Sequence, residues 1–177
     1  MYPAHFGLKK SLFDAGIAQD TGVFRSAKRA PITTNLEMAF TSPNAIVTLS
    51  GTPGVGKTTL ISTALRASTT RLALAWLNGM PTNATELLEL LLAEFGCSDH
   101  RATRMERLQI WRQFLSEMSA TESRVFIVVE RTEDLAPEVL RGLDALTAAD
   151  TNGCSGANVV LLGNEGLDEH LMPPLLE

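Results

Sequence analysis

The sequence predicts a three-layer α/β domain with a mostly parallel central sheet, and two observations support this prediction. Four short apolar runs alternate with segments of helical periodicity along the 177 residues, a pattern typical of parallel strands joined by helical crossovers. The first apolar run also leads directly into a glycine-rich loop that opens a helix. Because the carboxyl ends of parallel strands meet at one edge of the sheet, we expect the functional residues at that edge.

The four expected strands are residues 45–49, 71–77, 124–130 and 158–162. The second run is almost continuously apolar, which is typical of a parallel strand that helices cover on both faces. Polar residues follow two of the strands, namely Glu130 and Arg131 after the third and Asn164 after the fourth. These polar residues and the glycine-rich loop should therefore lie on the same edge of the sheet.

Helical segments are expected at residues 33–41, 60–66, 82–95, 102–118 and 137–148. Gly96 is expected to end the third of them. The fourth has an apolar stripe at helical spacing, formed by Met105, Leu108, Trp111, Leu115 and Met118. Trp76 and Trp111 both fall on the apolar patterns of their elements, which favours core positions over a role as stacking platforms.

The composition is that of a globular protein, with 45% hydrophobic residues and a formal net charge of −5, so there is no general attraction to nucleic acid. The two cysteines, Cys97 and Cys154, fit no metal-binding or redox spacing and are interpreted as free thiols. No apolar run approaches the roughly 20 residues that span a membrane, and the N-terminus lacks the features of a signal peptide. We therefore expect a cytoplasmic protein, with docking to a membrane partner still open.

The glycine-rich loop matches G-x-x-x-x-G-K-[ST] at every fixed position. Its backbone N–H groups and the positive end of the following helix suit phosphate binding. In this motif Lys57 reaches the β- and γ-phosphates, and the hydroxyl of Thr58 binds Mg²⁺. The predicted cofactors are thus ATP and Mg²⁺, and the predicted binding residues are Gly51, Thr52, Pro53, Gly54, Val55, Gly56, Lys57, Thr58 and Thr59.

A hydrolysing site also needs a carboxylate on the metal side and a base that activates water. Glu130, at the end of the third strand, stands where the metal carboxylate is expected, so Thr58 and Glu130 are the predicted metal ligands. Arg131 stands where the activating glutamate is expected, and a guanidinium cannot accept a proton at neutral pH. Arg131 could instead pair with the γ-phosphate.

Two further residues complete the predicted catalytic set of Lys57, Glu130, Glu133 and Asn164. Glu133 follows Glu130 closely enough to replace the missing base if the loop turns back, and the neighbouring Asp134 is the alternative. Asn164 could hydrogen-bond the γ-phosphate or the attacking water, and an ordinary loop position is the equally weighted alternative.

Beyond these local patterns, the chain resembles the AAA+ ATPases of the ExeA/GspA type, the general secretion pathway protein A family. The resemblance begins with the N-terminal stretch Met1–Leu8 and Phe13, continues through the loop Gly51–Thr59, and covers nearly the whole chain. Its other parts are residues 87–96, 108–115, 125–135 and 160–167. The ATPases of the TniB and IstB type, which act on DNA, share a similar core.

The resemblance implies a P-loop NTPase of the AAA+ type that drives secretion or pilus assembly at the inner membrane. It also implies a homo-oligomer or an assembly-protein partner. Residues 1–32 are then an N-terminal arm, and residues 33–177 are a nucleotide-binding core with an incomplete C-terminal end. The family's arginine finger and helical lid are expected beyond the last residues, so we expect a fragment, a degenerate paralogue or a truncated chain.

The family's Asp-Glu-Ala-Gln stretch corresponds to residues 130–133, so the Walker B motif is degenerate and hydrolysis is less firmly expected than binding. The first hypothesis is an ATPase with slow or oligomer-dependent turnover, and the second is a nucleotide-dependent adaptor without hydrolysis. A third hypothesis, a DNA-transposition or helicase-loader ATPase, depends on a basic cluster formed by Arg101, Arg104, Arg107 and Arg112. DNA binding is not favoured, because such a cluster is more often the solvated face of an amphipathic helix. A small-molecule kinase has less support, because no second basic substrate-binding motif stands out.

Overall fold

The computed structural model of the chain describes residues 30–77, 80–148, 156–167 and 171. Most of the predicted N-terminal arm lies outside this part, including residues 1–8 and Phe13, with which the family resemblance begins. Cys154 also lies outside it. Cys97, which lies inside it, is a free thiol as expected.

The sheet consists of four parallel strands in the order β1-β4-β3-β2, so the predicted parallel sheet is confirmed. The strands are β1 (Ile46–Ser50), β2 (Leu72–Leu77), β3 (Arg124–Val129) and β4 (Asn158–Gly163). Ser50 pairs with Gly163, and Leu77 pairs with Val129, so all four strands end at the same edge. The segments that follow β1, β3 and β4 build the candidate site.

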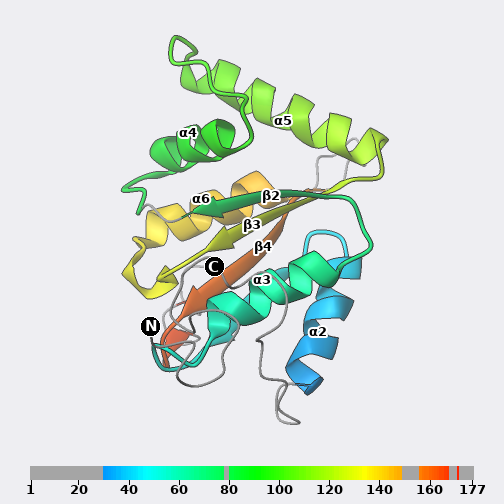
Figure 1. Cartoon of the computed structure of the whole chain (residues 1–177). Helices are drawn as coiled ribbons and strands as arrows, with labels where there is room; N and C mark the ends of the chain where they lie inside the picture. The colour runs from blue at the N-terminus through cyan, green and yellow to red at the C-terminus, as the bar shows by residue number, and fades with distance from the viewer. Residues whose placement is uncertain (1–29, 78–79, 149–155, 168–170, 172–177) are drawn as a thin grey trace, which may run out of the picture.

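Helices cover both faces of the sheet, which confirms the three layers (Figure 1). On one face lie α2 (Ala30–Thr41) and α3 (Lys57–Ala67); on the other lie α4 (Ala84–Glu94), α5 (Arg104–Ala120) and α6 (Pro137–Thr147). A short 3-10 helix, η2 (Thr132–Asp134), follows β3 and was not predicted. Helix α2 begins before the expected residue 33, with Pro31 in its first turn, where a missing N–H is tolerated.

The central strand β3 divides the core into two layers by simple alternation. Val125, Ile127 and Val129 pack against α4, α5 and α6, whereas Phe126 and Val128 pack against α2 and α3. The ring of Phe40 in α2 meets Phe126 edge to face, with 5.1 Å between ring centroids. β3 is therefore buried on both faces up to Val129, its last residue, and Glu130 begins the loop that follows.

The prediction that helices cover both faces of residues 71–77 is wrong for one face. Ala75 and Leu77 are buried against the α4 layer, but Leu74 on the opposite face is 41% exposed and Trp76 is half-buried. The reason is the position of β2, which is an outer strand of the described sheet rather than a central one.

The expected stripe on α5 is confirmed except at its first member. Leu108, Trp111, Leu115 and Met118 pack against the core, but Met105 is 67% exposed. Met105 lies in the first turn of the helix, before the part that contacts the core begins.

Side-chain caps that the sequence analysis did not anticipate fix the starts of two helices. Asn83 caps α4, and Thr103 forms a capping box with Glu106 at α5. Hydrogen bonds from the backbone N–H and the hydroxyl of Thr103 lower the pKa of Glu106. Equivalent bonds from Thr82 lower the pKa of Glu86. At the other end of α4, Gly96 takes a left-handed φ of 70° and ends the helix, as predicted.

Candidate functional site

The glycine-rich loop connects the end of β1 to the start of α3, and its backbone takes conformations that residues with a Cβ atom rarely adopt. Gly54 and Gly56 have φ values of 82° and 88°, in the left-handed region that glycine adopts without strain. Gly56 is also the N-cap of α3, and it offers no side-chain oxygen to the first N–H groups of the helix. These N–H groups and the positive end of α3 remain available for an anion.

Lys57 begins α3 and folds back over the loop. Its ammonium nitrogen Nζ donates to the carbonyl oxygen of Gly51 at 2.5 Å and to that of Thr52 at 3.1 Å. The ammonium charge of Lys57 is thus held against the first two carbonyl groups of the loop.

The carboxylate of Glu130 lies beside the loop, as the sequence predicted. Thr58 donates its hydroxyl to Oε1 of Glu130 at 2.9 Å. Trp76, near the end of β2, donates its indole N–H to the same oxygen at 3.3 Å. One carboxylate oxygen therefore accepts from both α3 and β2, and among the described residues no partner is recorded for the other.

Thr58 and Glu130 fit the requirements of Mg²⁺. Both supply hard oxygen donors, and Mg²⁺ is usually held by one or two carboxylates together with waters and substrate phosphates rather than by a full protein cage. The described residues contain no group of three or more His, Cys, Asp or Glu side chains that could hold a metal ion.

The residue after Glu130 has an unusual conformation. Arg131 has a left-handed φ of 55°, and its side chain is 70% exposed. Its guanidinium pairs with Asp134 one turn later, with an Nε to Oδ2 distance of 2.8 Å. Arg131 therefore lies at the rim of the site with a partner on its own loop.

Glu133 points back to the end of β4. Its Oε2 accepts from the backbone N–H of Asn164 at 3.3 Å. A Cβ atom added to Gly163 would lie 2.8 Å from that oxygen, so the glycine leaves room for the carboxylate. The loop does turn back as Glu133 would need, and it brings Glu133 and Asn164 together.

Thr132, which the sequence analysis did not single out, holds this loop in place. Its side chain is fully buried, and its hydroxyl lies 3.3 Å from the carbonyl oxygen of Val129 and 3.2 Å from that of Leu162. It thereby connects the ends of β3 and β4 beneath Glu133. A threonine within a polar loop carries no sequence signal for this role, because the contact depends on which strands are neighbours.

These groups surround one pocket of about 460 Å³ at the carboxyl edge of the sheet. It is lined by Pro53, Lys57, Thr58, Glu130, Arg131, Glu133, Asp134, Leu162, Gly163 and Asn164. Every predicted catalytic and metal-binding side chain is among them. Of the residues predicted to bind the cofactor, Pro53, Lys57 and Thr58 line the pocket. The others do not line it, namely Gly51, Thr52, Gly54, Val55, Gly56 and Thr59.

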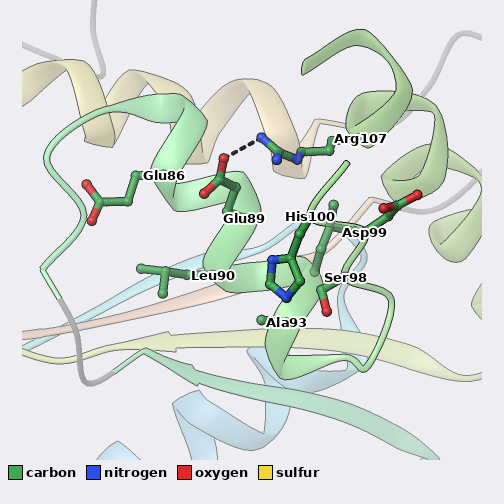
Figure 2. A pocket seen from close by; sticks show the side chains of 9 residues that line it. Glu86, Glu89, Leu90, Ala93, Ser98, Asp99, His100 and Arg107 are labelled. Atoms are coloured by element: carbon green, nitrogen blue, oxygen red, sulfur yellow. Dashed lines mark hydrogen bonds and ion pairs between the residues drawn. The ribbon is translucent and has the colours of Figure 1, made fainter. Parts of the chain in front are cut away.

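A second pocket, of about 260 Å³, lies between α4 and the start of α5 (Figure 2). It contains several carboxylates, but they are engaged within the chain. Glu86 accepts from Thr82, and Glu89 forms an ion pair with Arg107, one member of the basic cluster. This pocket lacks the combination of free N–H groups, cation and carboxylate that the first one has.

Residues 41–171 match the family model described as AAA domain. The chain belongs to this family. It is also 26% identical, over 177 residues, to general secretion pathway protein A of Aeromonas hydrophila, which confirms the resemblance found in the sequence. That match covers 99% of the chain but 32% of the relative, so the chain spans about a third of the relative's length.

Two solved structures share the AAA+ fold at low sequence identity. The ORC2 protein of Aeropyrum pernix, in its ADPNP-ADP complexes, superposes with a TM-score of 0.63 at 15% identity, over 89% of this chain and 46% of that one. CDC6P of Pyrobaculum aerophilum superposes with a TM-score of 0.62 at 18% identity, over 88% of this chain and 44% of that one. These similarities confirm the predicted P-loop fold. Within the described residues, no helix has the length and apolar character needed to cross a membrane.

Proposed function

We propose that this AAA domain binds Mg²⁺-ATP in the pocket at the carboxyl edge of the sheet and hydrolyses it slowly to drive assembly of a secretion or pilus complex. The observation that carries the proposal is the convergence of Lys57, Thr58 and Glu130, from two separate segments, around one pocket. The match to general secretion pathway protein A supports the assembly role.

In the proposed binding mode, the N–H groups at the start of α3 receive the phosphates. Lys57 turns from the carbonyl oxygens of Gly51 and Thr52 to phosphate oxygens, which its ammonium group binds as a point charge. Thr58 and Glu130 hold Mg²⁺, which would neutralise charge on the phosphates.

For hydrolysis, Glu133 is the proposed base and Asn164 the proposed positioning group for water. The carboxylate of Glu133 is half-buried and lies at the pocket wall, which suits a group that accepts a proton from water. The protein is proposed to act as a homo-oligomer or with an assembly-protein partner, in the cytoplasm or at the inner membrane.

Calorimetric titration of the chain with ATP and Mg²⁺ tests the binding step. Lys57→Ala should weaken ATP binding by about tenfold to a hundredfold, the range for losing a charge-assisted hydrogen bond. Arg66→Ala removes an exposed positive charge from the same helix, away from the pocket, and should leave ATP affinity unchanged. Equal affinity of the unaltered chain and Lys57→Ala would refute the proposal.

The alternative function is a nucleotide-dependent adaptor that binds ATP without hydrolysing it. The specific observation in its favour is Arg131, which occupies the position after Glu130 and is paired with Asp134. Single-turnover phosphate release separates the two functions. If release stays at background both in the unaltered chain and in Arg131→Glu, the adaptor is the correct function.

A further inference from the structure

Trp76 takes part in the site although its sequence position indicated a core residue. It belongs to β2, an outer strand that contributes no residue to the lining of the pocket. Its indole nevertheless reaches the carboxylate of Glu130 and donates a hydrogen bond at 3.3 Å.

The strand register produces this contact. Trp76 pairs with Val128 on β3, and Glu130 lies two positions after Val128. Residues two apart in an extended segment project from the same face of the sheet, so the indole and the carboxylate lie side by side. The backbone N–H of Glu130 also donates to the carbonyl of Leu77, at 3.4 Å, which continues the pairing of the two strands to the site.

The indole N–H differs chemically from the other donor to Glu130. The hydroxyl of Thr58 can both donate and accept, so it can turn towards a cation, whereas the indole N–H can only donate. When Thr58 turns to a metal ion, Trp76 therefore remains as the donor that holds Oε1. The second oxygen, Oε2, has no recorded partner among the described residues and is left for a cation.

We propose that Trp76 is a positioning residue that holds the Glu130 carboxylate in the orientation that binds Mg²⁺. This inference rests on the proposed function, in which Mg²⁺-ATP occupies the pocket. It assigns a role in metal loading to β2, the strand farthest from the glycine-rich loop in the sheet.

The test is the variant Trp76→Phe, which keeps an aromatic ring but removes the N–H donor. We expect the ATP-bound variant to bind Mg²⁺ about threefold to tenfold more weakly, the usual effect of one hydrogen bond. ATP affinity measured without Mg²⁺ should not change. The matched control is Leu74→Ala, which removes apolar surface from the same face of β2 without approaching Glu130, and should leave Mg²⁺ affinity unchanged.

A double variant tests whether Trp76 acts through Glu130. In the Glu130→Ala background, Trp76→Phe should cause no further loss of Mg²⁺ affinity. An equal additional loss there would mean that Trp76 acts by packing alone and would overturn the proposal.

A measurement on the unaltered chain covers the case in which Trp76→Phe does not fold. The indole N–H resonance of Trp76, identified by its persistence in Trp111→Phe, should shift when Mg²⁺ is added to the ATP-bound protein. If the chain binds ATP but this resonance does not shift with Mg²⁺, the role of Trp76 is wrong and the proposed function still stands. If the unaltered chain binds no ATP, both proposals fail together.

Discussion

The two halves of the candidate site are built in different ways. The phosphate half is one continuous stretch, residues 51–59, whose shape comes from its own backbone and from the helix that it opens. The strand-end half brings together β2, β3, β4 and η2, through contacts such as Trp76 with Glu130 and Glu133 with Asn164. The first half matches the phosphate-loop motif at every fixed position, whereas the second departs from the Asp-Glu-Ala-Gln stretch of the similar family and has Arg131 in place of its glutamate. The residues of the phosphate half are therefore neighbours in the sequence, whereas those of the strand-end half become neighbours only when the strands pair.

The largest effect that would sharpen this comparison concerns turnover. Glu133→Gln should reduce single-turnover phosphate release by about a hundredfold or more, the usual contribution of a general base. Its affinity for Mg²⁺-ATP should change little, because Glu133 is not among the residues proposed to hold the phosphates or Mg²⁺. Rapid-quench measurement of phosphate provides the rate.

The control for that experiment is Glu138→Gln, which neutralises an exposed carboxylate in the first turn of α6. It should leave the rate unchanged. If Glu133→Gln also turns over at the normal rate, the strand-end half performs its chemistry without this carboxylate and the assignment of the base is wrong.

A smaller effect separates metal binding from phosphate binding. Glu130→Ala should weaken ATP binding about tenfold in the presence of Mg²⁺ and hardly at all in its absence, because only the metal contact is lost. Glu130→Asp keeps the charge on a shorter side chain, so its ATP affinity in the presence of Mg²⁺ should lie between those of the unaltered chain and Glu130→Ala. Isothermal titration with and without EDTA distinguishes these cases, and an equal loss under both conditions would contradict the division into two halves.

The smallest effect concerns stability. Thr132→Val keeps the shape of a buried side chain but removes its hydroxyl from the carbonyls of Val129 and Leu162, which should lower the free energy of unfolding by about 1–2 kcal/mol. Turnover should fall as η2 loosens, while ATP affinity remains. Chemical denaturation and phosphate release measure the two consequences.

Thr147→Val is the matched control for that variant. Thr147 is also buried, but its hydroxyl donates to the carbonyl of Asp144 within its own helix, away from the pocket. It should lower stability without altering turnover. Equal turnover in both variants would show that Thr132 serves the fold only.

The same contrast explains what sequence reasoning could reach. The strands, the helices and the phosphate loop follow from periodicity and from one contiguous motif, so they were predicted with bounds that differ by only a few residues. The neighbourhood of the phosphate loop, Glu130 and Asn164 followed from the rule that parallel strands end at one edge, whereas the position of Glu133 depended on a turn of the loop. The contacts of Trp76 and Thr132 did not follow, because they depend on strand order and register.

The contacts of Lys57 with its own loop have a consequence for the energetics of binding. Two carbonyl oxygens hold its ammonium group, so contacts within the chain define the shape of the loop. The conformational entropy of ordering the loop is then lost during folding and not during association, which is the condition for preorganised recognition. In the proposed binding mode, ATP would mainly exchange the carbonyl partners of one lysine for phosphate oxygens.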